Sequence, residues 1–254
     1  MIVFIAPYSS STSLNQTPAP VSTNPFDHGK VLLFNKPKDW TSFDAVKKVR
    51  NLCRTKKVGH AGTLDPLATG LLIICTGPKT KQIQFIQADE KEYTGSFFLG
   101  ATTASYDLET EVENIVDINH LTNELIHAAT KNFIGTILQT PPLYSAVKIN
   151  GQRAYTIARK GGHQVLEPKE ITIREFEITN IELPIVEFRV TCSKGTYIRS
   201  LANDFGKVLN TGAYLQSLCR TRIGEYLLKD ALEIKDFAES ELVLSLKSQK
   251  TKEA

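Results

Sequence analysis

The sequence predicts an α/β fold of the α+β kind, in which a mixed, largely antiparallel central sheet is flanked by helices. Short apolar runs typical of strands alternate irregularly with amphipathic stretches typical of helices. Hairpin-type turns such as Asn150-Gly151 join several of these segments. The chain has 254 residues, of which 41% are hydrophobic and 22% charged. These values are ordinary for a globular protein with a substantial core, and no internal repeat is present.

The first half of the chain shows this alternation clearly. Residues 31–34 are typical of a buried strand, which the Asn-Lys-Pro that follows would end. Thr41 or Ser42 can cap the next helix, for which we expect an apolar face made of Phe43, Val46, Val49, Leu52 and Cys53. The other elements of this half are expected at residues 71–75 (strand), 79–87 (helix) and 91–99 (a strand that carries Tyr93).

The second half continues in the same way. The acidic stretch at residues 107–117 is typical of a loop or a peripheral strand. We expect helices at residues 121–131, 153–160 and 197–209, strands at residues 145–149, 171–179 and 187–192, and a last core segment at residues 214–223.

Domain organisation and location follow from composition. Residues 7–28 are rich in Ser, Thr, Pro and Asn, so we expect a flexible extension over residues 1–29 and one folded domain over residues 30–254. The four cysteines form no Cys-x-x-Cys pair and have no His at ligand spacing, which supports neither a zinc site nor disulfides. No apolar run approaches the roughly 18 residues of a membrane span, and the start lacks the basic segment of a signal peptide. We therefore expect a cytoplasmic monomer without a metal.

Charge is unevenly distributed, although the formal net charge is only +3. Residues 30–65 contain nine Lys or Arg and three acids, whereas residues 101–130 contain six acids and no Lys or Arg. A basic face beside Asp65 would suit a polyanion, through phosphate contacts and counterion release. Taken alone, a solvated helix face is the simpler explanation of such a run.

Residues 59–70, Gly-His-Ala-Gly-Thr-Leu-Asp-Pro-Leu-Ala-Thr-Gly, place one carboxylate in a glycine-rich loop directly before an apolar strand. Pro66 biases the backbone of Asp65 away from the α region, which holds the carboxylate on an extended segment. Leu64 and Leu67 can anchor both sides of the loop in a core. Such a loop directs one acid into a cleft, although an Asp-Pro pair alone is also a common turn.

These twelve residues closely resemble the catalytic loop of the TruB-type tRNA pseudouridine synthases, in which the matching Asp is the essential nucleophile. Four further stretches are similar to motifs of that family, at residues 33–37, 91–93, 144–151 and 192–200. The resemblance extends over about residues 30–224. It implies the pseudouridine synthase fold and an isomerase that uses no cofactor and acts on tRNA, with residues 30–254 as its catalytic domain.

By this resemblance Asp65, Arg199 and Tyr93 are the catalytic residues. Arg199 would pair with the carboxylate, because an arginine stays charged and can bind it through two hydrogen bonds, and Tyr93 would stack on the target base. Considered alone, Tyr93 is typical of a core aromatic and Arg199 of a surface ion pair. The resemblance assigns substrate binding to His60, Lys36, Lys148, Leu218 and Tyr197. Candidates for contacts with the RNA backbone are Lys56, Lys57, Lys148, Arg153 and Arg220.

We therefore predict isomerisation of uridine 55 in the T-loop of tRNA, by base flipping and Asp-dependent cleavage and re-formation of the glycosidic bond. Two features depart from the family pattern. Ala104 replaces an Asp, which removes a polar contact near the flipped nucleotide. The chain also ends about thirty residues after Gly224, too few for the family's C-terminal RNA-binding domain, which implies fewer contacts with remote parts of the RNA.

Other function classes are less well supported. A non-catalytic RNA-binding or RNA-folding module of the same fold is the main alternative, but binding alone does not require Asp65. A guide-RNA-dependent relative relies on an added C-terminal domain. A glycosidase normally needs two acids facing one bond, and the motifs supply no acidic partner for Asp65. Neither of the common glycine-rich nucleotide-binding motifs occurs.

Overall fold

The computed structural model describes residues 22–145, 147–149, 151–159, 164 and 166–252, and these residues are organised around one ten-stranded sheet. The strand order is β14-β1-β3-β12-β4-β11-β10-β7, with β2 paired to β3 and β13 paired to β12. In this described part, β14 runs parallel to β1 and β12 runs parallel to β3, while the other pairs are antiparallel. The predicted mixed, largely antiparallel sheet is confirmed.

The elements have the following bounds. The strands of the large sheet are β1 Val31–Lys36, β2 Val58–His60, β3 Thr69–Thr76, β4 Lys91–Leu99, β7 Gly135–Gln139, β10 Lys169–Glu182, β11 Ile185–Cys192, β12 Ala213–Ile223, β13 Tyr226–Leu227 and β14 Leu232–Glu233. Two small hairpins consist of β5 Thr102–Thr103 with β6 Val112–Glu113, and β8 Lys148–Ile149 with β9 Gln152–Arg153. The helices are α1 Ser42–Cys53, η1 Gly77–Gln82, α2 Ile83–Ala88, α3 Asn123–Ala129, η2 Thr130–Phe133, α4 Ala154–Ala158, α5 Ile198–Val208, η3 Leu228–Asp230, α6 Ile234–Ala238 and α7 Glu241–Lys252.

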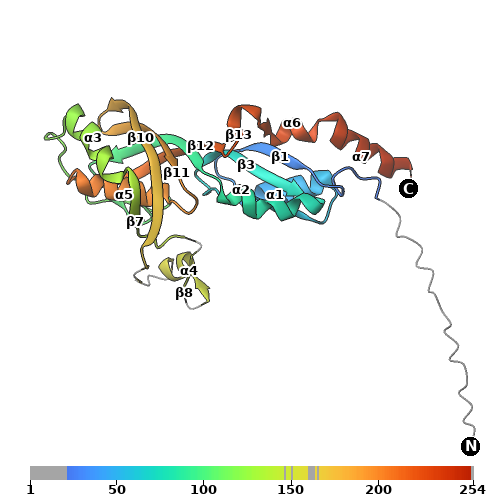
Figure 1. Ribbon diagram of the computed structural model, residues 1–254, viewed down its shortest axis with the longest axis horizontal. Helices are drawn as coiled ribbons and strands as arrows, with labels where there is room; N and C mark the ends of the chain where they lie inside the picture. The colour runs from blue at the N-terminus through green and yellow to red at the C-terminus, as the bar shows by residue number, and fades with distance from the viewer. Residues whose placement is uncertain (1–21, 146, 150, 160–163, 165, 253–254) are drawn as a thin grey trace, which may run out of the picture.

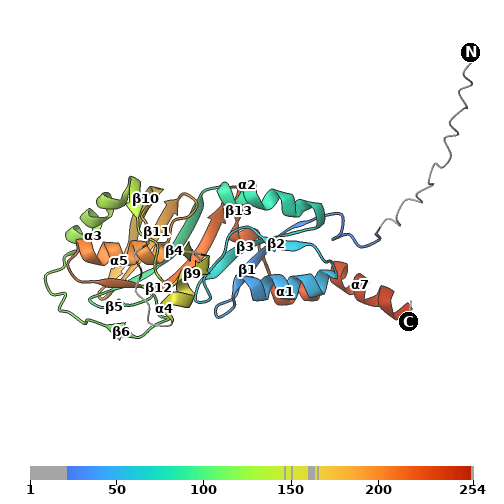
Figure 2. The ribbon, with the colours of Figure 1, turned by 90° about the horizontal axis from the view of Figure 1, so that it is seen from below.

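The sheet runs along the length of an elongated molecule and carries helices on both faces (Figures 1 and 2). α1 and α2 cover opposite faces of the half of the sheet that contains β1 and β3. Figure 2 shows these strands between the two helices. α3 and α5 lie beside the other half. In that half an aromatic group fills the core, where Phe97 stacks on Phe188 with ring centroids 4.2 Å apart. The catalytic loop predicted at residues 59–70 begins at the end of β2 and continues into β3. Thr69 and Gly70 at its end pair with β12, the first strand of the other half, so the loop lies where the two halves meet.

The start of α1 follows the predicted cap, and Val46, Val49 and Cys53 lie on the buried side as predicted, but Phe43 does not. Thr41 accepts a hydrogen bond from the backbone of Asp44, and the Asp44 carboxylate accepts one from the backbone of Thr41, which is a capping box. The buried side of the helix begins at Ser42, because its hydroxyl is bonded to the backbone of Leu64. Phe43 is therefore turned outward and is 64% exposed, so its prediction as a core residue was wrong.

The folded body begins earlier than the boundary that we predicted at residue 30. Phe26 is fully buried and packs edge-on against Phe237 of α6, with ring centroids 6.0 Å apart. Residues 22–29 therefore belong to the packed body, and residues 1–21 lie outside the described part. The predicted helix at residues 79–87 starts with the 3-10 segment η1, which carries Pro78 in its first turn. No helix in the described part is long and apolar enough to cross a membrane.

Candidate active site

The loop that carries Asp65 is fixed by hydrogen bonds from the first residue of α1 and from the segment before the helix. The Ser42 hydroxyl accepts from the Leu64 N–H at 2.8 Å and donates to the Leu64 carbonyl at 3.1 Å. The backbone N–H of Asp39 donates to the carbonyl of Pro66 at 2.9 Å. Both neighbours of Asp65 are thus tied to the body of the protein, which restricts the positions open to its carboxylate.

Lys36, the last residue of β1, supports the same loop from the interior of the protein. Its side chain is 0% exposed, and Nζ donates to the carbonyls of Pro37, Trp40 and Pro66 at 2.8, 2.6 and 3.3 Å. Burial lowers the pKa of Lys36 to about 8, while the carboxylate of Asp65 acts in the opposite direction. Substrate binding by Lys36 stays a prediction; among the described residues, its buried ammonium donates to three backbone carbonyls and so holds the loop that presents Asp65.

Arg220 holds the loop from the side of the sheet. Its guanidinium donates from Nε to the Leu71 carbonyl at 2.8 Å, from Nη2 to Gly62 at 3.1 Å and from Nη1 to Thr63 at 3.4 Å. The side chain is 1% exposed. The prediction that Arg220 contacts the RNA backbone was therefore wrong. Because β12 lies directly beside β3, the guanidinium donates its hydrogen bonds to carbonyls of the loop and of β3.

Asp65 and Arg199 form the predicted pair. Arg199 Nε lies 2.9 Å from Oδ2 of Asp65, and Nη2 donates to Oδ1 at 3.2 Å. The Arg199 side chain is 5% exposed, whereas that of Asp65 is 39% exposed. Arg199 is held in turn by the carbonyls of Tyr144 and Ser105. A buried, fixed cation thus orients a carboxylate that solvent, and hence a substrate, can reach.

Asp107 is a member of the site to which the sequence analysis assigned no role. Its Oδ2 lies 3.6 Å from Nε of Arg199, and its side chain is 7% exposed. Burial raises the pKa of Asp107, while the guanidinium of Arg199 acts in the opposite direction. Ala104, which replaces the family's Asp, is exposed. The acid that touches Arg199 is therefore at position 107, and it lies behind the arginine rather than facing Asp65 across a cleft.

Tyr93 and His60 lie near the same loop. Tyr93 in β4 is 8% exposed and pairs in register with Arg220 of β12. Burial raises the pKa of its hydroxyl, while Arg220 acts in the opposite direction. His60, at the end of β2, is half-buried, and burial lowers its pKa below the ordinary value, so the imidazole is neutral at pH 7. Neither geometry supplies a second charged group to the site.

The remaining residues predicted to bind substrate lie at different depths. Leu218 stands opposite Gly95 of β4 and lines a pocket of about 520 Å³ together with Leu67 of the catalytic loop. Tyr197 directly precedes α5 and is half-buried, and both polar groups of its backbone are bonded to the Gln139 amide. The backbones of Lys148 and Arg153 pair across the β8–β9 hairpin, but their side chains lie outside the described part, as do Ala146 and Asn150 of the same segment.

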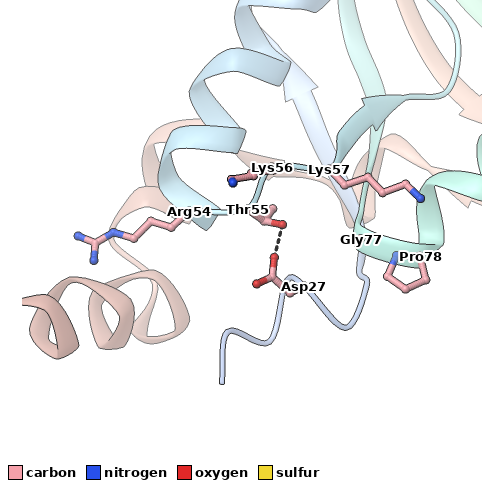
Figure 3. Close-up of a pocket in the computed structure, with 7 residues that line it drawn as sticks. All are labelled: Asp27, Arg54, Thr55, Lys56, Lys57, Gly77 and Pro78. Carbon is pink, nitrogen blue, oxygen red and sulfur yellow. Dashed lines mark hydrogen bonds between the residues drawn. The ribbon is translucent and has the colours of Figure 1, made fainter. Parts of the chain in front are cut away.

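Lys56 and Lys57 are not beside Asp65. They line a pocket of about 370 Å³ at the end of α1, together with Arg54, Thr55 and Gly77 (Figure 3). The pocket adjoins the far end of β3, because the N–H of Gly77 donates to the carbonyl of Lys57. The predicted basic face beside the catalytic loop is thus displaced to the opposite end of the strand for these two lysines.

Comparison with known proteins identifies the family to which a chain with this site belongs. Residues 50–198 match the family model of the TruB family pseudouridylate synthase (N terminal domain). The chain belongs to the TruB family of pseudouridine synthases. It is 54% identical to the tRNA pseudouridine synthase B of Flavobacterium johnsoniae over 84% of this chain and 96% of that protein. It is 50% identical to the protein of the same name from Phocaeicola vulgatus, over 84% of this chain and 94% of that one. The predicted enzyme class, a pseudouridine synthase and hence an isomerase, is confirmed.

Solved structures support the same TruB assignment. A chain in the crystal structure of a Cbf5-Nop10-Gar1 complex superposes with a TM-score of 0.67 and 28% identity, over 84% of this chain and 54% of that one. A chain in an H/ACA RNP bound to a substrate RNA gives 0.63 and 25%, over 84% and 53%. The chain therefore spans about half the length of these solved relatives. The fold predicted from the motifs, the pseudouridine synthase fold, is confirmed.

Proposed function

We propose that this TruB-family enzyme converts uridine 55 in the T-loop of tRNA to pseudouridine, with Asp65 as the reacting carboxylate. The observation that carries the proposal is the two-point contact of the buried Arg199 with the half-exposed Asp65. The relatives that match over almost their whole length are named tRNA pseudouridine synthase B, which supports tRNA as the substrate. A tRNA substrate also fits the cytoplasmic location predicted from the sequence.

The reaction breaks the bond between the sugar C1′ and N1 of uracil, rotates the base and joins C5 to C1′, after which the proton on C5 is lost. Asp65 either attacks the sugar or removes a sugar proton to promote elimination; in both routes it must be ionised and close to C1′. Arg199 orients it, because the guanidinium binds both carboxylate oxygens. The detached base would rest between Tyr93 and Leu218, on the side of the sheet that faces the loop.

A uridine stacked within an RNA loop cannot reach Asp65, so the nucleotide must be flipped out. Unstacking costs a few kcal/mol, which contacts with the pocket and with phosphates offset. The neutral imidazole of His60 suits a position beside the extruded nucleotide, since it adds bulk without a charge that would compete with Arg199 for Asp65.

The test is release of tritium from T-arm RNA labelled at C5 of uracil, with no cofactor added. Wild type should release tritium and Asp65→Asn should not. Asp39→Asn is the matched control, because it removes an exposed carboxylate from the neighbouring segment and Asn tolerates the positive φ of 67° at that position. Full activity in Asp65→Asn would refute the assignment.

The alternative, a non-catalytic RNA-binding or RNA-folding module, makes a different prediction in the same experiment. Wild type would then bind the RNA tightly and release no tritium. The Arg199–Asp65 pair favours the enzyme, because binding alone does not need a carboxylate directed toward the negatively charged RNA.

A further inference from the structure

The end of β3 far from Asp65 carries a cluster of cations that the reaction does not use. Arg54, Lys56 and Lys57 are all exposed and follow one another at the exit of α1, around the buried Thr55. Within the described residues, none of the three cations forms an ion pair with a carboxylate. Arg54 Nη1 donates to the carbonyl of Leu246 in α7, which leaves the charge of the guanidinium unneutralised. Cations without a paired carboxylate, around a hollow of about 370 Å³, are suited to an anionic ligand.

The one acid at this pocket is already bound elsewhere. Asp27 accepts hydrogen bonds from the hydroxyls of Thr55 and Ser22, so its charge is turned toward the protein. These two bonds are the main reason that the pKa of Asp27 lies below its ordinary value. Three further exposed lysines occur close to the pocket in the chain, namely Lys30, Lys79 and Lys81. Lysines and arginines therefore outnumber acids in the segments that line or adjoin this pocket.

The directions of the side chains distinguish a surface for a polymer from a site for a small anion. Figure 3 shows Arg54, Lys56 and Lys57 extending away from the Asp27–Thr55 hydrogen bond, with Lys57 on the other side from the first two. Cations that converge on one point would enclose a single phosphate. Cations spread along an edge match successive phosphates of a nucleic-acid backbone.

The distance from Asp65 identifies which part of an RNA could reach this cluster. The catalytic loop meets β3 near Gly70, and the pocket adjoins Thr76 and Gly77, so six residues of strand separate them. At about 3.3 Å per residue the separation is about 20 Å. A nucleic-acid helix rises roughly 3 Å per base pair, so 20 Å corresponds to about six base pairs. Nucleotides next to the flipped uridine cannot reach so far.

We propose that Arg54, Lys56 and Lys57 bind the phosphate backbone of the substrate's helical stem, about six base pairs from the flipped nucleotide. The proposal rests on the proposed function, since it takes a folded RNA with its target loop at Asp65. It assigns to this chain a second, sequence-independent RNA contact on the catalytic domain itself.

The test compares two RNAs that share the target loop: full-length tRNA and a hairpin cut to about four base pairs. Affinity is measured as a function of KCl concentration for wild type and for the double variant Lys56→Gln/Lys57→Gln. Each lost phosphate contact lowers the slope of log affinity against log salt by about 1. We expect a slope smaller by about 1 to 2 on tRNA, no change on the short hairpin, and unchanged turnover at saturation.

The matched control is Lys131→Gln/Lys229→Gln, which removes the same charge from exposed positions in η2 and η3. An unchanged slope on tRNA, or an equal change on both RNAs or in the control, would overturn the proposal. Tritium release by wild type on the short hairpin tests the proposed function separately, so failure of one does not imply failure of the other.

Discussion

Arg199 contacts Asp65 with two nitrogens, Nε at 2.9 Å from Oδ2 and Nη2 at 3.2 Å from Oδ1, while its Nε is also 3.6 Å from Oδ2 of Asp107. The arginine thus lies between a half-exposed carboxylate and a buried one. Asp107 contacts the inner side of the guanidinium and so helps to hold Arg199 in place. The fixed geometry of the planar guanidinium is what aligns both oxygens of Asp65.

Arg199→Lys should show that this geometry matters beyond the charge. Lysine keeps the positive charge but offers a single ammonium, so one of the two contacts with Asp65 is lost. A hydrogen bond to a charged group contributes about 1.5–3 kcal/mol, which corresponds to a fall in single-turnover rate of about tenfold to a hundredfold. Arg189→Lys is the control, because Arg189 pairs with Glu175 and Glu177 at a more exposed position. Equal rates for wild type and Arg199→Lys would mean that charge alone suffices.

Arg220→Met should separate positioning from catalysis. The variant fills a similar volume but leaves the carbonyls of Gly62, Thr63 and Leu71 without their donors. The Leu71 carbonyl is buried, and a buried polar group without a partner costs about 1–3 kcal/mol, so urea unfolding should shift to lower concentration. The folded fraction should also lose activity, because Gly62 and Thr63 lead into Asp65. A variant that is destabilised yet fully active when folded would show that Arg220 does not place the loop.

The sequence predicted those parts of the site that are encoded locally. Asp65, Arg199 and Tyr93 lie in short motifs that resemble those of the TruB family, and the structure brings these three residues around one loop. The roles of Lys36, Arg220 and Asp107 depend on which strands become neighbours. In the sheet β12 lies between β3 and β4, and both of these strands end more than a hundred residues before β12 begins. No local sequence pattern indicates that pairing. A charged residue that pairing buries looks the same in sequence as one on the surface.

Lys36→Met should change how stability depends on pH. In the folded protein the pKa of Lys36 is lowered to about 8 from 10.5, so between these values the unfolded chain binds more protons than the native state. Stability of wild type relative to the variant therefore rises with pH across this window, by up to about 3 kcal/mol. Urea unfolding of both proteins at pH 8 and pH 10 measures the difference. Lys38→Met, at an exposed neighbour, controls for the loss of a surface charge, and a pH-independent difference would contradict the prediction.

Phe43→Ser should cost little stability, although the helical pattern placed Phe43 in the core. Its ring is 64% exposed, and surface substitutions usually change the free energy of unfolding by less than about 0.5 kcal/mol. Val49→Ala on the buried side of the same helix removes two methyl groups from a fully enclosed site and should cost about 2 kcal/mol. Phe85→Ser, at 67% exposure in α2, is the matched control for removing an exposed aromatic ring. If Phe43→Ser proved as destabilising as Val49→Ala, the first turn of α1 would have to pack in the way the sequence pattern indicated, with Phe43 rather than Ser42 turned toward Leu64.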